Sequence, residues 1–342
     1  MNNLVIDYDH LYVSMMKCRR GVSWKPSVKH FLLNSVEETL KMERDLESGK
    51  WTNGTPRPIK IYYPKRRDAL SIPFRDRVYQ RSINDNVLYP KMSKKFIYDN
   101  CACQIGKGTD FARKQVKQHL WRYYTHHKNN GYVLQIDIHG YYSNMRHDSV
   151  RRTFSSIDND TFTRCMSILN DQYSGDIGFN PGSQMVQIAG ISVLNPLDHF
   201  IKEKLRVKHY IRYMDDFWLL TNSKIDAESW LKAIQNKLSS LGLEINKNKT
   251  KIIQLKQGFS FLGFNYKLLD SGKVLMTVNS QCVKHEKLKI LRMSNKVRRG
   301  DMTEDKMRES YNSTINYIML GNSTKLVNKL DHYYKEVLYA KH

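Results

Sequence analysis

Two adjacent acids, Asp215 and Asp216, lie between two apolar, β-prone runs of the chain. Ile211-Arg212-Tyr213 precedes them and Phe217-Trp218-Leu219-Leu220 follows, so the pattern predicts a β-hairpin with carboxylates at its tip. Consecutive side chains on a strand point to opposite faces, and a turn is therefore needed to bring paired acids toward one spot. Carboxylate oxygens gathered in this way can hold hard cations such as Mg²⁺. The alternative interpretation is an ordinary acidic turn exposed to solvent.

A third acid, Asp137, comes at the end of the apolar strand predicted over Tyr132–Ile138. In phosphoryl transfer between nucleotides, two divalent ions can activate the attacking oxygen and stabilise the leaving one. Such a site needs at least two carboxylates that come from separate strands. Asp137 and the pair Asp215-Asp216 meet this requirement if their strands lie side by side in one sheet.

The chain is strongly basic. Its 342 residues include 56 Lys and Arg against 33 Asp and Glu, which gives a formal net charge of +23. An excess of this size implies a polyanionic partner, and nucleic acid is the leading candidate because neutralised phosphates release counterions. A membrane surface is the competing explanation, but no apolar run is long enough to span a bilayer and the N-terminus lacks the layout of a secretion signal. We therefore expect a cytoplasmic protein with no membrane partner.

The spacing of apolar residues indicates which elements position these acids. Helices are predicted within 11–50, over 75–92, from 109 through 120, over 227–241 and, as two or three helices, over 284–342. Strands are predicted over 59–63, 69–72 and 132–138, with a β-hairpin over 259–278 that turns at Asp270-Ser271-Gly272. The five cysteines have an odd count and irregular spacing, which predicts reduced thiols and argues against a disulfide framework or a zinc finger.

Two segments resemble the palm motifs of a reverse transcriptase. They are Asp137-Ile138-His139-Gly140-Tyr141-Tyr142 and Tyr213-Met214-Asp215-Asp216. Four further segments resemble motifs of that family in the family's order: the first and second fingers motifs at 72–80 and 105–109, the helix-to-strand motif at 241–250 and the primer grip at 261–264. The resemblance implies an α+β fold with right-hand polymerase architecture, made of fingers, a palm with an antiparallel sheet, and a helical thumb.

The same resemblance implies domain boundaries. An N-terminal helical extension would cover 1–55, and the fingers would cover 56–130 together with part of 145–190 between the palm motifs. The palm, with the metal site and the primer grip, would cover 131–280. A helical thumb would cover 281–342.

Catalytic roles follow from the resemblance residue by residue. Asp137, the backbone carbonyl of Ile138, Asp215 and Asp216 would bind two Mg²⁺ ions, and Asp215 is expected to matter most. Lys249 resembles the lysine proposed to protonate the departing pyrophosphate, although a neighbouring lysine or none could serve. Assistance by a general acid would contribute modestly beside the metal ions.

Three residues are candidates for binding the incoming deoxynucleoside triphosphate (dNTP). Tyr142 falls where the family places an aromatic ring against the sugar 2′ carbon, so a ribonucleotide's 2′-hydroxyl would clash with it. A core aromatic is the alternative reading for Tyr142. Lys65 and Arg67 lie on the basic turn of the fingers hairpin and could clamp the triphosphate, with a solvated basic turn as the alternative.

A fourth candidate for nucleotide binding, Gln187, also bears on the branch of the family. The segment Pro181–Gln187 matches a motif that reads Gln-Gly-x-x-x-Ser-Pro in most reverse transcriptases and Gly-x-x-x-Ser-Gln in those of diversity-generating retroelements. Gln187 agrees with the second pattern, whereas Val186 departs from both. That branch implies template RNA, a cDNA or primer, and dNTPs as ligands, frequent errors opposite template adenines, and a small basic oligomeric accessory protein as partner.

Two alternative functions remain at this stage. A retron, group II intron-like or phage-defence reverse transcriptase would carry the same core motifs. A non-catalytic RNA-binding protein with a decayed polymerase fold is the more remote alternative. It would have little physical reason to keep these three acids, because uncompensated carboxylates in an apolar palm are costly without metal.

Overall fold

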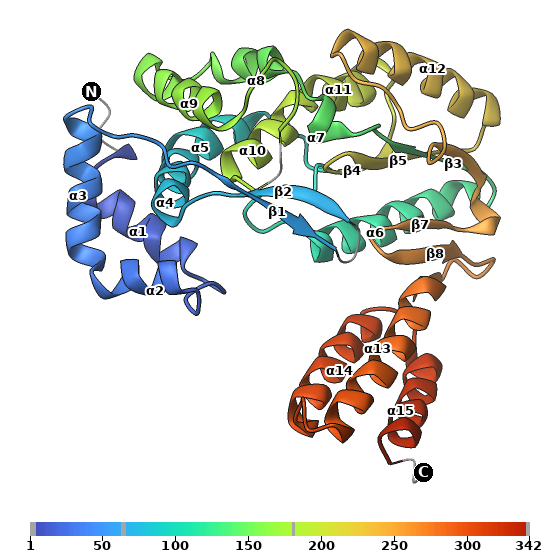
Figure 1. Ribbon diagram of the computed structural model, residues 1–342. Coiled ribbons are helices and arrows are strands. Elements are labelled where there is room, and N and C mark those ends of the chain that lie inside the picture. The colour runs from blue at the N-terminus through green and yellow to red at the C-terminus, as the bar shows by residue number, and fades with distance from the viewer. Residues whose placement is uncertain (1–4, 63–65, 180–181, 340–342) are drawn as a thin grey trace. The chain divides into compact units, whose positions relative to one another are not determined.

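A computed structural model describes residues 5–62, 66–179 and 182–339 of the chain (Figure 1). These residues form helices and small sheets in which the strands pair mainly antiparallel, so the predicted α+β class is confirmed. The chain folds as two compact units, each built from separate stretches of sequence. The first contains Met1–Ala112, Ile136–Phe217 and Ser229–Thr250, and the second contains Arg113–Gln135, Trp218–Glu228 and Lys251–His342.

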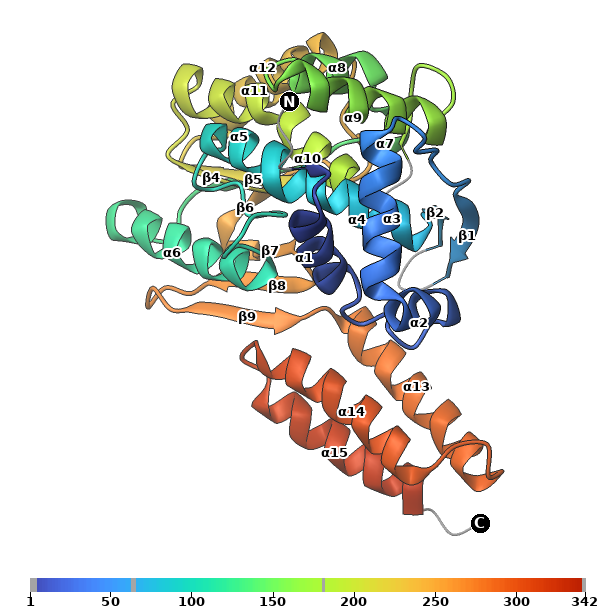
Figure 2. The ribbon, with the colours of Figure 1, turned by 90° about the vertical axis from the view of Figure 1, so that its left-hand side faces the viewer.

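Three helices, α1 (Tyr8–Cys18), α2 (Pro26–Leu33) and α3 (Ser35–Glu47), open the first unit (Figure 2). α1 begins where the carboxylate of Asp7 accepts a hydrogen bond from the backbone N–H of His10 at 3.0 Å. This bond satisfies one of the free backbone donors in the first turn. The helices predicted within 11–50 are therefore confirmed.

The two short strands predicted after these helices are also present. β1 (Arg57–Ile61) pairs antiparallel with β2 (Arg67–Ser71), and Ile61 is opposite Arg67. Residues 63–65 between the strands are outside the described residues, and Lys65 with them. Arg67 is described through its backbone pairing alone.

The helix predicted over 75–92 is present but changes its winding. It consists of α4 (Phe74–Ile83), a π-helical turn η2 (Asn84–Leu88) and α5 (Tyr89–Met92). Pro90 has no N–H to donate to the preceding turn, which favours a local rearrangement of the hydrogen bonds. The N–H of Tyr89 instead donates to the carbonyl of Asn84, which is the longer bond of a π turn.

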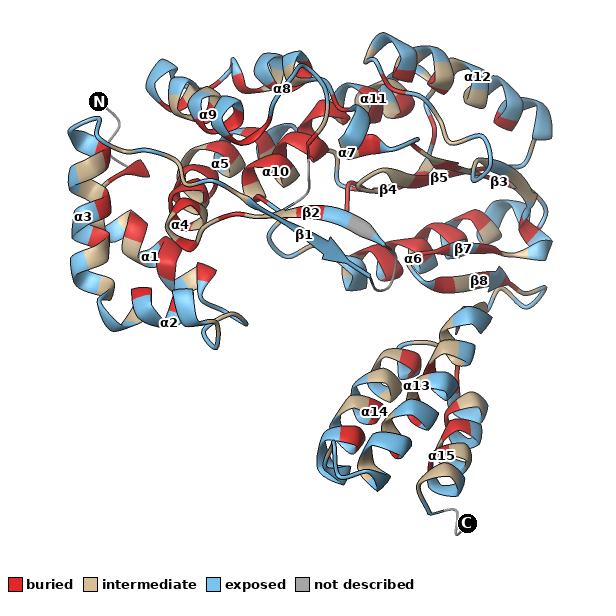
Figure 3. Cartoon of the chain, in the orientation of Figure 1, coloured by how far each residue is buried: buried red, intermediate tan, exposed pale blue. Residues whose placement is uncertain are grey.

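Several shorter helices complete the first unit. They are α7 (Tyr141–Asn144), α8 (His147–Phe154), α9 (Asn159–Gln172), α10 (Gln184–Val193), α11 (Asn195–His199) and the π-helical η4 (Phe200–Lys204). α10 is buried along most of its length (Figure 3). A helix that is apolar on all sides belongs in a core, so α10 is the central helix of this unit.

A four-stranded sheet carries the acids. Its order is β4 (His209–Tyr213), β5 (Asp216–Thr221), β3 (Tyr132–Asp137) and β6 (Lys251–Gln254). β3 and β5 are neighbours in this order, so the strand that ends at Asp137 lies beside a strand of the acidic hairpin. The strands that bear Asp137 and the acidic pair therefore lie side by side in one sheet, as a shared site requires.

The region after β6 differs in part from the prediction. The predicted hairpin exists as β8 (Phe264–Leu268) and β9 (Val274–Val278), but β7 (Phe259–Phe261) adds a third antiparallel strand. Leu262 and Gly263 form the two-residue turn before β8, with φ of +48° and +83°. Such turns require positive φ at both positions, which a leucine rarely adopts, and for this reason the sequence did not suggest a turn there.

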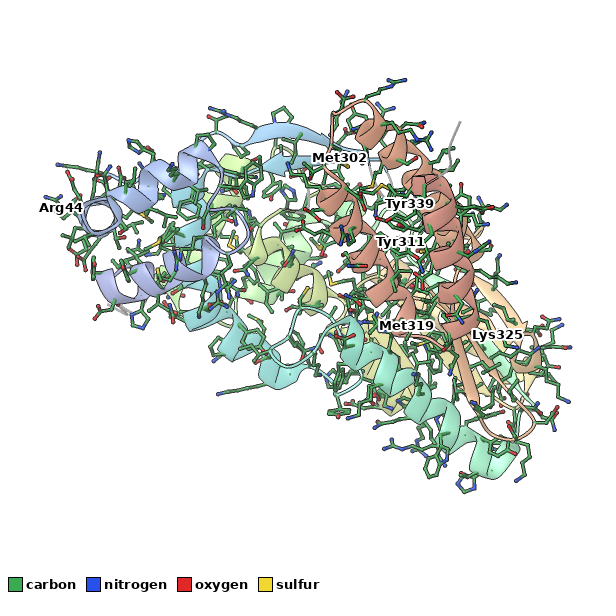
Figure 4. All side chains as sticks on the ribbon, turned by 90° about the horizontal axis from the view of Figure 1, so that it is seen from below. Arg44, Met302, Tyr311, Met319, Lys325 and Tyr339 are labelled. Carbon is green, nitrogen blue, oxygen red and sulfur yellow. The ribbon has the colours of Figure 1, made fainter. Side chains whose placement is uncertain are left out.

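Longer helices belong wholly or partly to the second unit. They are α6 (Thr109–His127), α12 (Lys224–Ser240), α13 (Ser280–Arg298), α14 (Glu304–Met319) and α15 (Thr324–Tyr339). The last three confirm the predicted C-terminal helices, and Figure 4 labels Tyr311 on α14. The ring of Tyr311 stacks on that of Tyr334, on α15, with 4.3 Å between the ring centroids. In the part of the chain that the structure describes, no helix is long and apolar enough to cross a bilayer. All five cysteines are free thiols, as predicted.

Candidate active site

The segment after α12 extends the sheet beyond the end of β3. The N–H of Asn246 donates to the carbonyl of Asp137 at 2.7 Å, and the N–H of His139 donates to the carbonyl of Glu244 at 2.8 Å. Ile138 and Ile245 between them form an antiparallel bridge. These bonds fix the backbone of the first palm motif against the motif that follows the acidic hairpin.

This arrangement brings Lys249 to Asp137. The turn that begins at Asn246 is closed by the N–H of Lys249, which donates to the Asn246 carbonyl at 3.1 Å. The Lys249 Nζ then lies 3.0 Å from both carboxylate oxygens of Asp137. The Lys249 side chain is 53% exposed and that of Asp137 is 18% exposed, so the pair lies at the surface and water reaches it. The structure thus joins two residues that the sequence assigned to one site.

A buried charge network lies beneath the acidic hairpin. The guanidinium of Arg212, on β4, pairs with the carboxylate of Asp198, on α11, and both side chains are fully buried. Their Nε–Oδ1 distance is 2.7 Å, and the hydroxyl of Tyr210 donates to the same Oδ1 at 2.6 Å. Arg212 Nη1 also donates to the carbonyl of Met214 at 3.0 Å.

The Met214 carbonyl belongs to the turn that carries Asp215. Met214 has a φ of +56°, a left-handed conformation that is uncommon for a residue with a side chain. The hydrogen bond from Arg212 compensates part of the cost of this conformation, because a charged donor forms the stronger kind of hydrogen bond. The position of Asp215 therefore depends on a buried ion pair.

The segment just before the second fingers motif is joined to the same strand. The N–H of Cys101 donates to the Arg212 carbonyl at 2.9 Å, and the Sγ of Cys103 lies 3.7 Å from the Sδ of Met214. Lys107 in the glycine-rich segment donates to the carbonyl of Asn100 at 3.0 Å. Its ammonium is therefore used within its own loop.

Tyr142 lies in the neighbourhood of the acidic turn. Burial raises the pKa of its phenol, and the charges of Cys103 and Asp215 act in the same direction. Its ring lies against α10 at Gly190, where an added Cβ would come within 3.2 Å of the ring carbon Cε1. Tyr142 is half-buried, so it is not a fully enclosed core residue.

Gln187 lies near the start of α10, which is tied to α4. The hydroxyl of Ser183 caps the helix by accepting from the N–H of Met185 and donates to Gln80. Gln187 is half-buried and lines a cavity of about 520 Å³ together with Cys103. Val186 is fully buried, so the position that departs from both family patterns faces the apolar core.

The side chains of the site offer the type of donor atom that magnesium prefers, but they do not form a complete set of ligands around one point. Asp137, Asp215 and Asp216 supply carboxylate oxygens, which Mg²⁺ prefers, and such sites usually combine one or two carboxylates with substrate phosphates. Among the described residues no three His, Cys, Asp or Glu side chains are grouped closely enough to hold a metal. The carboxylate of Asp137 holds the ammonium of Lys249, which shows that it accepts a cation at this position.

Comparisons with known proteins identify the family of the chain. The family described as reverse transcriptase (RNA-dependent DNA polymerase) matches residues 67–266, which is more than half of the chain. No significant match was found among curated proteins.

Solved structures of telomerase are similar in fold. Telomerase from Candida albicans in complex with a TWJ fragment of telomeric RNA gives a TM-score of 0.52 at 13% identity, covering 90% of this chain and 63% of that one. Apo telomerase from Candida tropicalis gives a TM-score of 0.49 at 12% identity, covering 71% of this chain and 53% of that one. The apo telomerase of the same organism truncated from its C-terminal domain gives a TM-score of 0.49 at 15% identity, covering 66% of this chain and 55% of that one. The chain spans less than two thirds of the length of these telomerases, and the first likeness supports the right-hand polymerase fold.

Proposed function

The chain belongs to the reverse transcriptase family, and from this premise we propose that it is an RNA-directed DNA polymerase that makes cDNA from a structured template RNA. The observation that carries the proposal is the meeting of Asp137 and Lys249 at 3.0 Å on a strand that neighbours the acidic hairpin. A site that joins nucleotides needs carboxylates from separate strands and a cation beside the phosphates. The neighbouring strands that bear Asp137 and Asp216, with Lys249 beside Asp137, support such a site.

In the proposed mechanism, Asp137, Asp215, Asp216 and the Ile138 carbonyl would hold two Mg²⁺ ions, and the bound ions would supply charge stabilisation for the attacking and leaving oxygens of the transfer. Lys249 lies at the same carboxylate and is half exposed. We propose that its ammonium donates a proton to the departing pyrophosphate.

Nucleotide selection is assigned to residues around the acidic turn and the fingers hairpin. Tyr142, held against Gly190, is proposed to exclude ribonucleotides by blocking space for the 2′-hydroxyl. Gln187 borders the adjacent cavity and is proposed to contact the nucleotide or template. Lys65 and Arg67 are proposed to bind the triphosphate. The boundaries of fingers, palm and thumb given above belong to the same proposal.

We propose further that the enzyme belongs to the diversity-generating branch. Gln187 supports this assignment, and it carries with it error-prone copying opposite adenines and a small basic oligomeric accessory protein. Sequencing the cDNA made from the native RNA tests it: substitutions concentrated at template adenines are expected. Faithful cDNA from a structured noncoding RNA would favour a retron-like, intron-like or phage-defence enzyme.

Primer extension by the purified protein tests the general function. We expect Mg²⁺-dependent synthesis on an RNA template, and loss of that synthesis in Asp215→Asn. Asp226→Asn removes the same charge from an exposed position on α12 and serves as the matched control, which should retain activity. Strong RNA binding with no synthesis under any of these conditions would favour a non-catalytic RNA-binding protein.

A further inference from the structure

A second cavity lies in the first unit among α5, α8 and the junction of α10 with α11. Its volume is about 300 Å³, at the lower end of the range for small-ligand sites. None of the residues assigned above to catalysis or nucleotide binding lines it. It therefore needs an explanation of its own.

Two cations line this cavity and no carboxylate does. Lys95 lies at the end of the short helix η3 (Ser93–Lys95), and its Nζ is 3.5 Å from the hydroxyl of Ser156. Arg152, on α8, has Nη2 at 3.4 Å from the hydroxyl of Ser149. Within the described residues neither cation takes part in an ion pair. An anion entering the cavity would meet two charges and two hydroxyls and would displace no acid.

The rest of the wall combines apolar side chains with the hydroxyls of Thr153 and Ser192 and the amide of Asn195. Phe96, Pro196 and Leu241 contribute partly accessible apolar surface. The amide oxygen Oδ1 of Asn195 is buried and has no hydrogen-bond partner in the described part of the chain. A buried acceptor without a partner costs about 1–3 kcal/mol. A turn of the Asn195 side chain toward the cavity would let a donor on the ligand satisfy this oxygen.

The ligand that fits this wall has an anionic end, a flat apolar body and a hydrogen-bond donor on that body. We propose that the cavity binds a nucleoside monophosphate unit, with its phosphate between Lys95 and Arg152 and its base against Phe96 and Pro196. An exocyclic amine on the base would donate to Asn195. The unit can be a free nucleotide or one nucleotide of an RNA strand, because both present the same chemistry.

Binding is tested in full-length Asp215→Asn protein with EDTA present, so that nucleotide bound at the catalytic residues does not contribute. Equilibrium dialysis with labelled AMP forms one arm, and fluorescence anisotropy with a labelled ten-nucleotide RNA forms the other. The test variant is Lys95→Ala/Arg152→Ala. The matched control is Lys94→Ala/Arg151→Ala, which removes the same charge from adjacent residues that do not line the cavity.

The proposal predicts that the test variant loses at least about tenfold in affinity while the control loses less than about twofold, because two charged hydrogen bonds are removed only in the former. Leu241→Trp, which fills the cavity without changing charge, should weaken binding in the same arm. IMP, which replaces the exocyclic amine with a carbonyl, should bind more weakly than AMP.

The two arms separate the sources of the ligand. A loss of AMP affinity in the test variant identifies a site for free nucleotide. A loss of RNA affinity alone identifies a contact with the RNA strand. Either result supports the proposed binding site. Equal losses in test and control variants, or unchanged binding in Leu241→Trp, would overturn the proposal in favour of general electrostatic attraction. Because these assays need no synthesis, their outcome is independent of whether the chain proves to be a polymerase.

Discussion

Replacing Asp198 by Asn gives the most quantitative prediction, because Asp198 and Arg212 are both fully buried. The substitution keeps the shape of the side chain but leaves the guanidinium of Arg212 without its counter-charge. Removing one partner of a buried ion pair costs about 3–5 kcal/mol. We expect the free energy of unfolding of Asp198→Asn to fall by about this amount.

A second variant separates folding from positioning. In Arg212→Met/Asp198→Asn neither position of the former ion pair carries a charge, and the oxygen of the new Asn still accepts a hydrogen bond from Tyr210. We therefore expect most of the lost stability to return. The hydrogen bond from Arg212 to the Met214 carbonyl is absent in this variant. The acidic turn then loses its support, and primer-extension activity should stay low although the protein is folded.

Urea denaturation, fitted with one m-value for all variants, measures the free energies of unfolding, and primer extension measures the activities. Glu228→Gln serves as control, because Glu228 forms an exposed pair with Lys224 at 3.6 Å and should change stability by less than about 1 kcal/mol. An Asp198→Asn protein as stable as this control would refute the energetic argument. Full activity in the double variant would refute the positioning argument.

Three further predictions address single residues. Lys249→Gln removes the cation beside Asp137. In primer extension we expect the rate to fall by about 100-fold, and the Mg²⁺ concentration that gives the half-maximal rate to fall as well. An unchanged rate would exclude Lys249 as the proton donor. Tyr142→Ala should raise the use of ribonucleotides relative to deoxyribonucleotides by up to about 100-fold in kcat/KM, whereas Tyr142→Phe should not, and equal ratios would contradict the steric role. Burial raises the pKa of Asp76 from 3.8 to about 6, so its contribution to stability is full below the lower value and is lost as pH rises through the higher one. Asp76→Asn should therefore gain about 2 kcal/mol of unfolding free energy relative to the unchanged protein between pH 4 and pH 7.5, and parallel pH curves would show that the carboxyl is not perturbed.

The sequence predicts the framework of the site because its signals are local. The alternating apolar runs on either side of Asp215-Asp216 predict a hairpin, and the apolar strand before Asp137 predicts a neighbour for it. The sheet order places the two strands side by side. Helix periodicity likewise predicts the three C-terminal helices, since each has an apolar stripe and a clear break.

What the sequence does not predict depends on contacts between distant residues. Arg212 stands alone as a charge in an apolar strand, which is the one local sign of a buried pair, but nothing nearby identifies Asp198 as its partner. Lys249 is one of three lysines within six residues, and only the turn that begins at Asn246 selects it. The strand β7 (Phe259–Phe261) is missed because a leucine in its turn adopts positive φ.

The central claim is that Asp137 and Asp215 share a pair of catalytic metal ions. Anomalous diffraction from crystals grown with Mn²⁺, a dideoxy-terminated primer on an RNA template and the next dNTP measures this directly. We expect two Mn²⁺ sites about 3.5–4 Å apart, both within bonding distance of Asp215 and at least one of them bound by Asp137. Nucleotide bound with Mn²⁺ away from these two carboxylates would contradict it.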